Sequence, residues 1–198
     1  MSTRSFIAYE NNLGEVDCIY CHWDGYLKHV GQILQDHYAT KDRAKALISL
    51  GNLSSLGPIL EQSEFIKHFG FDNGFDYAQN GKEKLDKEFH TLPENVRLMI
   101  QHSEYDHCIA YYRDRAKFLT QKEQMRSMGC VLKKPQIQHF DSEKDFYASL
   151  KDNWAIEFVY LFKKGKWHVH FDECEYIDDS EKQFDGLLST ALRKFNED

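Results

Sequence analysis

The sequence of 198 residues has no apolar run that approaches the roughly 18 residues a membrane-spanning helix needs. Residues 1–6 also lack the long apolar stretch of a secretory signal peptide. The five cysteines are an odd number, which fits reduced thiols better than a disulfide framework. We therefore expect a cytoplasmic protein that does not use a membrane.

An excess of positive charge is missing as well. Lys and Arg number 25 against 32 Asp and Glu, which gives a formal net charge of −7. A protein that grips duplex DNA needs a clustered basic face to displace counterions from the phosphates. Here the acidic residues are interleaved with Lys and Arg, as on an ordinary solvated surface. The sequence thus predicts no duplex nucleic-acid partner.

Several catalytic motifs are absent too, namely GxxxxGK[ST], GxGxxG, GxSxG and HExxH. The enzyme classes that depend on those motifs are therefore not indicated, although enzymes in general stay possible.

What the chain does have is material for a core. Hydrophobic residues make up 41% and aromatic residues 14%, although the mean hydropathy is only −0.64. Rings bury much area each, so a polar average is compatible with a well-filled interior. We expect residues 1–198 to form a single domain. Residues 62–95 are polar with spaced rings, which indicates an insertion packed on that core.

Two hairpins dominate the expected architecture. Residues 5–10 and 16–23 alternate as strands around a turn rich in Asn and Gly. Residues 155–162 are apolar at almost every position, as in a strand covered on both faces, and turn into a strand at 167–171. The prediction is an α+β fold with a mainly antiparallel sheet. Further expected elements are a strand at 108–112, a turn-rich connector at 52–60, and helices near 27–38, 40–50, 93–99, 116–128 and 180–195.

A candidate binding site lies where the second strand meets the first helix. His22, Trp23, Asp24 and Tyr26 follow one another there, with a glycine between the last two. Loop residues on a rigid scaffold often bind ligands, and two rings beside an acid can stack a flat ligand or anchor a partner. The alternative is structural: Asp24 caps the helix and the rings enter the core.

The second candidate is the tract of Arg113, Asp114 and Arg115, which follows an apolar strand. Two guanidinium groups so close suit an oxyanion or a carboxylate, whereas a surface ion pair is the alternative. Arg4 can lie near this tract if the first and third strands are neighbours. We then expect Asp24 and the arginines to share one surface.

Metal and cofactor patterns are weak. Cys18, Cys21 and His22 match the haem-attachment pattern CxxCH, but positions 18 and 21 of a strand point to opposite faces. His168, His170 and Asp172 share one strand face and can form a metal triad. We nevertheless expect no cofactor, because simple alternation explains that face, with the core face filled by Trp167, Val169 and Phe171.

Four tracts resemble a family of uncharacterised small proteins encoded by bacteriophages and prophages. The resemblance implies an accessory role, such as acting on host machinery or countering host defence. The leading hypothesis is binding of a host protein or a small ligand. The matching tracts are MSTRSxI (1–7), IYCHWDGY (19–26), LIxLGxLSSL (47–56) and YYRDR (111–115).

Two other hypotheses remain open. One is a small enzyme acting on a nucleotide or another phosphorylated substrate, with Arg113 and Arg115 holding phosphate and Asp24 or Asp114 as base. The other is a metal-binding protein that uses His168 and His170.

Overall fold

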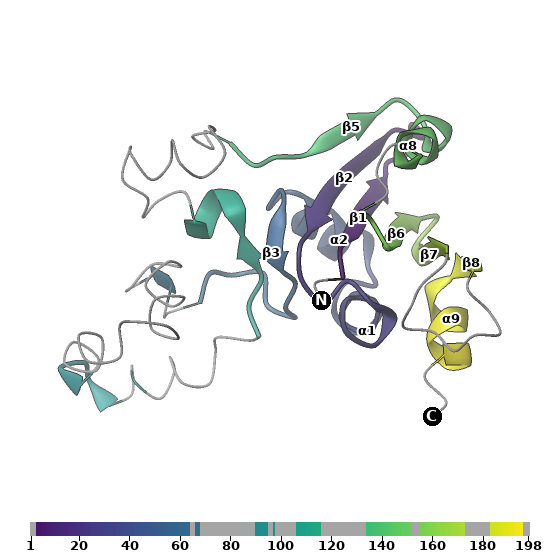
Figure 1. Ribbon diagram of the computed structural model, residues 1–198. Coiled ribbons are helices and arrows are strands. Elements are labelled where there is room, and N and C mark those ends of the chain that lie inside the picture. Colours follow the sequence, from purple (N-terminus) through teal and green to yellow (C-terminus); the bar gives the residue numbers. More distant parts are fainter. Residues whose placement is uncertain are drawn as a thin grey trace.

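The centre of the molecule is a twisted sheet with helices on either side (Figure 1). The computed structural model describes residues 3–63, 66–67, 90–94, 97, 106–115, 134–151, 155–172 and 183–195. Within them the strands are β1 (Ser5–Glu10), β2 (Val16–Cys21), β3 (Leu53–Ser55), β4 (Ile109–Ala110), β5 (Gln138–Phe140), β6 (Phe158–Lys163), β7 (Lys166–Asp172) and β8 (Gln183–Leu187). Their order is β4-β3-β2-β1-β6-β7-β8, and β5 pairs with β2.

Both predicted hairpins are confirmed. β1 and β2 are antiparallel, with Ser5 opposite Cys21, and so are β6 and β7, with Phe162 opposite Trp167. The second hairpin turns through Lys164 and Gly165, whose φ angles of 51° and 78° suit a two-residue turn between twisted strands. β6 is central and buried from its first residue to its fifth, as its apolar run predicts.

The α+β class is confirmed, and the sheet is mainly antiparallel as predicted, but it is mixed because it also contains parallel pairings. Among the described strands, five pairings are antiparallel and two are parallel. β6 lies parallel to β1, with Ser5 opposite Phe158 and Tyr9 opposite Phe162. The reason is long-range: the chain leaves the first hairpin on one side of β1 and returns to the other side in the same direction.

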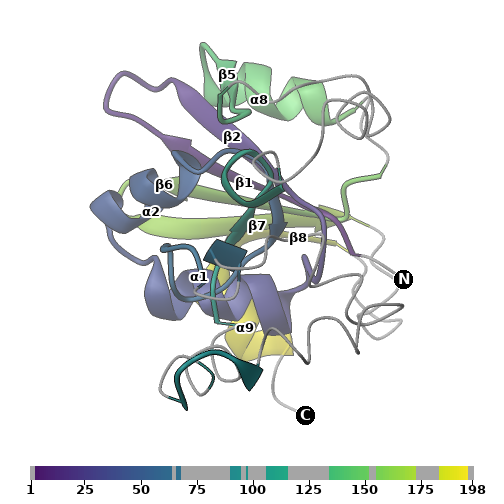
Figure 2. The same cartoon turned by 90° about the vertical axis from the view of Figure 1, so that its left-hand side faces the viewer.

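Helices cover both faces of the sheet (Figure 2). One face carries η1 (Leu27–Gly31), α1 (Gln32–His37), α2 (Lys41–Ile48) and α9 (Leu188–Phe195), and the larger core lies beneath them. The other face carries α8 (Glu143–Leu150), whose Phe146 fills a smaller core. Cys21 belongs to the first core and Cys18 to the second, so the two thiols do point to opposite faces.

The first helical segment is a short π-helix followed by α1, and the next helix starts as predicted. Thr40 is its N-cap, and its hydroxyl oxygen accepts a hydrogen bond from the Arg43 backbone N–H at 3.4 Å. No helix in the described parts of the chain has the length and apolar character that spanning a bilayer requires.

Other predicted elements need correction. The connector at 52–60 contains β3, and residues 183–187 of the expected final helix form β8. The strand expected at 108–112 ends at Ala110, because a buried aspartate turns the chain into η2 (Tyr111–Arg115). No prediction covered β5 or α8. The predicted helix at 116–128, and most of the insertion at 62–95 and the helix at 93–99, lie outside the described residues.

Candidate functional site

The loop that follows β2 presents a tryptophan to solvent. We call residues 22–26 the Trp23 loop. The indole of Trp23 is 46% exposed, one of the few large hydrophobic side chains so exposed in the described residues. The backbone of the loop is nevertheless fixed, because the N–H groups of His22 and Trp23 donate to the carbonyls of Leu53 at 3.1 Å and Ser54 at 3.0 Å. The exposed ring therefore stands on an ordered backbone.

Gly25 fixes the loop from the other side. Its N–H donates to the Thr3 carbonyl at 2.9 Å, and its carbonyl accepts from the buried Tyr160 hydroxyl at 2.8 Å. A Cβ atom at this position would lie 2.9 Å from the Cβ of Ser5. Only glycine lets the loop approach β1 so closely, so this residue is required by packing.

Asp24 adopts the left-handed conformation, with φ of 56°, and its side chain is exposed. The alternative prediction, that Asp24 caps the first helix, is wrong. Tyr26 occupies the N-cap position of η1, and no side chain makes a capping hydrogen bond there. Tyr26 itself is partly buried against the larger core. A non-glycine residue held at positive φ is a common feature of functional loops, since the surrounding structure must enforce it.

A cluster of polar side chains adjoins Trp23 on the α8 face of the sheet. The Tyr20 hydroxyl lies 2.8 Å from Nδ1 of His22, and the His22 ring meets the Trp23 ring edge-on at 4.6 Å. Partial burial raises the pKa of Tyr20, while the nearby guanidinium of Arg4 opposes that shift. The Arg4 backbone N–H in turn donates to a carboxylate oxygen of Glu157 at 3.2 Å.

The structure therefore brings three of the predicted site residues together: Arg4, His22 and Trp23. Tyr20 belongs to the same group, and the sequence reasoning missed it. Strand alternation could have identified Tyr20, because residues 20 and 22 both fall in the predicted strand at 16–23 and would share a face there. The register of β1 against β2 accounts for Arg4, since Phe6 lies opposite Tyr20 and Arg4 is two residues from Phe6 on the same face.

Arg113 and Asp114 serve the interior instead. Asp114 is fully buried, and its two carboxylate oxygens accept from the Ala110 backbone N–H at 2.7 Å and from Nε of Arg113 at 2.8 Å. The guanidinium of Arg113 also donates to the carbonyls of Leu60 and Cys108. With both oxygens engaged, Asp114 is poorly suited to act as a general base. The pair ties the backbone at residue 60 to the backbone at residues 108–110.

The two predicted tracts meet through Asn52 rather than through an ion pair. The side-chain oxygen of Asn52 accepts a hydrogen bond from the backbone N–H of Tyr20 at 2.8 Å. The backbone carbonyl of Asn52 accepts one from the backbone N–H of Tyr111 at 3.0 Å. In the described part of the chain, Arg113 pairs with Asp114 and not with Asp24. The side chain of Arg115 lies outside the described residues.

The histidines of β7 lie on the α8 face. The ring of His170 meets Tyr147 edge-on at 5.9 Å, and partial burial, aided by Lys163, lowers the pKa of His168. The side chain of Asp172 lies outside the described residues. Among the side chains that the structure does describe, no group of three or more His, Cys, Asp or Glu residues is arranged to hold a metal ion.

The Trp23 loop presents the side chains of Trp23 and Asp24 at the surface. A hollow of about 450 Å³ lies at the opposite end of β1, beside Tyr9 and Glu10. No protein-family model matches the chain, and no curated protein or solved structure shows significant similarity to it.

Proposed function

We propose that this protein is a bacteriophage- or prophage-type accessory protein that acts by binding a host protein in the bacterial cytoplasm. The Trp23 loop is the binding surface. The observation that carries the proposal is a tryptophan 46% exposed on a backbone fixed from two sides. Tryptophan is among the residues that most often dominate protein interfaces, and exposing one without a partner gains the fold nothing.

The rigidity of the loop favours binding. Association must offset the loss of side-chain and loop freedom, so an anchor that is already ordered loses less on binding. Four hydrogen bonds hold residues 22–25 against β3, β6 and the segment that precedes β1 before any partner arrives. The cost of ordering the loop is therefore met during folding.

The charge around Trp23 indicates what kind of partner fits. Asp24 is exposed beside the indole, and the chain as a whole carries a net charge of −7. The complementary surface is an apolar pocket for the indole with Lys or Arg at its rim. The phage setting is supported by the resemblance described above, since the tract at 19–26 includes the whole loop.

The test compares three forms of the protein as bait in a lysate of a bacterial host. Wild type and Leu13→Ala should retain the same partner, and Trp23→Ala should lose it. Leu13 is a matched control because it is 83% exposed but lies in the β1–β2 turn at the far end of the sheet. Calorimetry with the purified partner should then show Trp23→Ala binding weakened by about 30-fold, the loss typical of an interface hot spot.

Thermal unfolding of the three forms checks that the fold is intact. A partner that Trp23→Ala retains as well as wild type does would refute the proposal. Equal losses with Trp23→Ala and Leu13→Ala would also refute it, because they would show general stickiness of exposed apolar side chains.

A further inference from the structure

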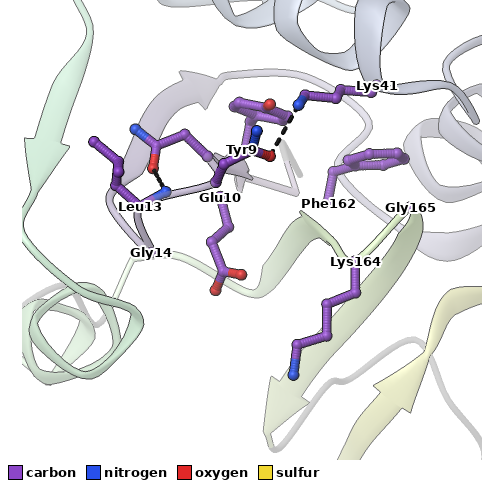
Figure 3. A pocket seen from close by; sticks show the side chains of 10 residues that line it. Tyr9, Glu10, Leu13, Gly14, Lys41, Phe162, Lys164 and Gly165 are labelled. Carbon is purple, nitrogen blue, oxygen red and sulfur yellow. Dashed lines mark hydrogen bonds between the residues drawn. The ribbon is translucent and has the colours of Figure 1, made fainter.

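The hollow at the opposite end of β1 is built by three separated parts of the chain (Figure 3). Tyr9 and Phe162 lie at its base, where their rings are stacked at a centroid distance of 6.2 Å and are largely buried in the core. Lys41, the first residue of α2, reaches in from one side, while Glu10 and Lys164 extend on the other. The volume of about 450 Å³ lies in the range of small-molecule sites.

The walls of the hollow are ordered. In the β1–β2 turn, the side-chain oxygen of Asn11 accepts from the backbone N–H groups of Leu13 at 2.8 Å and Glu15 at 3.1 Å. Asn12 accepts from the ammonium group of Lys41 at 2.9 Å, which joins the turn to α2. The shape of the hollow is therefore set by contacts within the fold.

The polar groups in the hollow are not neutralised by one another. Among the described residues, no ion pair involves Lys41, Lys164 or Glu10. Two ammonium groups and one carboxylate leave this hollow positive, on a chain whose net charge is −7. A locally positive hollow on an acidic protein attracts small anions selectively.

The position of the hollow in the sheet also indicates a ligand. β1 and β6 are parallel neighbours, and the hollow lies beyond their carboxyl ends. At this end the chain leaves β1 toward β2 on one side and leaves β6 toward β7 on the other, so the strand order reverses here. In open sheets with parallel strands, that reversal point at the carboxyl ends is where ligands bind.

We propose that this hollow binds a phosphate ester of nucleotide size that carries free hydroxyl groups. Lysine ammonium groups bind phosphate as point charges, which is the role of Lys41 and Lys164. The Glu10 carboxylate accepts hydrogen bonds from hydroxyl groups such as those of a ribose. The site is separate from the Trp23 loop and does not depend on the function proposed for it.

The experiment is an NMR titration of the ¹⁵N-labelled full chain with adenosine monophosphate. The amides of Gly14 and Gly165 report on the hollow because both residues line it. We expect saturable shifts at both glycines, and we expect adenosine, which lacks the phosphate, to bind much more weakly. Lys41→Gln and Lys164→Gln should each weaken binding by about tenfold, as expected for losing a charged hydrogen bond.

Lys45→Gln is the matched control, because Lys45 is an exposed lysine of the same helix that does not line the hollow. It should bind as wild type does, and so should Trp23→Ala. The proposal is overturned if no saturable shift appears up to about 10 mM nucleotide, since such binding would be too weak to matter. It is equally overturned if adenosine binds as well as the monophosphate, or if Lys45→Gln weakens binding as much as Lys41→Gln.

Discussion

Replacing Tyr160 with Phe tests whether the Trp23 loop is held in place from within the core. Tyr160 is fully buried on β6, and its hydroxyl donates to the carbonyl of Gly25 at 2.8 Å. Tyr160→Phe keeps the ring and its stacking on Phe158, whose centroid is 6.2 Å away, and removes only the hydroxyl. The change therefore removes the hydrogen bond that the hydroxyl donates to the loop and leaves the ring in place.

The size of the expected loss of stability follows from the Gly25 carbonyl, which is left without this donor. Gly25 is buried, and the hydroxyl of Tyr160 is the donor that the described structure gives its carbonyl. A buried acceptor that loses its partner destabilises the fold by about 1–3 kcal/mol. We expect the free energy of unfolding to fall by that amount, and the Gly25 amide to exchange faster than in wild type.

Urea unfolding followed by circular dichroism, together with hydrogen exchange, measures both effects. Tyr9→Phe is the matched control: Tyr9 is also a buried tyrosine of the sheet, but none of the described contacts is a hydrogen bond of its hydroxyl. It should change stability by less than about 0.5 kcal/mol. Equal stability of Tyr160→Phe and wild type, with unchanged exchange at Gly25, would show that the loop does not depend on this contact.

Two further predictions concern buried groups. Asp114→Asn should destabilise the protein by about 3 kcal/mol in urea unfolding. This value is at the low end for a broken buried ion pair, because the side chain of Arg113 is still 21% exposed. A change below about 1 kcal/mol would contradict the interior role of the pair. Cys21 should resist iodoacetamide at about pH 8, because burial raises the pKa of its thiol to about 12 and thiolate is the reactive form. Peptide mapping after alkylation measures this, and modification at the rate of an unfolded control would show that the site opens readily.

Much of the sheet could be predicted from local pattern. The turn at 11–15 and the alternation on either side of it specify the first hairpin, and the apolar run at 155–162 specifies a strand buried on both faces. The β8 segment was mistaken for helix because Gln183–Leu187 is short, polar and next to a genuine amphipathic helix. Its pairing with β7, which the local sequence does not contain, makes it a strand.

The candidate site divides in the same way. The sequence singled out Trp23 and His22 because a strand ends there in a turn, and both residues do lie at the surface of that turn. It placed Arg113 and Asp114 on the same surface, whereas the structure turns both toward backbone groups of residues 60, 108 and 110. Charged residues after a strand look alike in sequence whether they meet solvent or unpaired backbone groups.

By itself, therefore, the sequence determined the α+β class, both hairpins, the opposed faces of Cys18 and Cys21, and the loop that carries Trp23. These features depend on residues close together in the chain, where the two-residue period of a strand and the needs of a turn decide the outcome. Only the tertiary structure decided that β6 lies parallel to β1. Neighbours in a sheet are chosen by contacts that no local pattern encodes. The pairing brings the turns after both strands to the same end of the sheet and so creates the hollow.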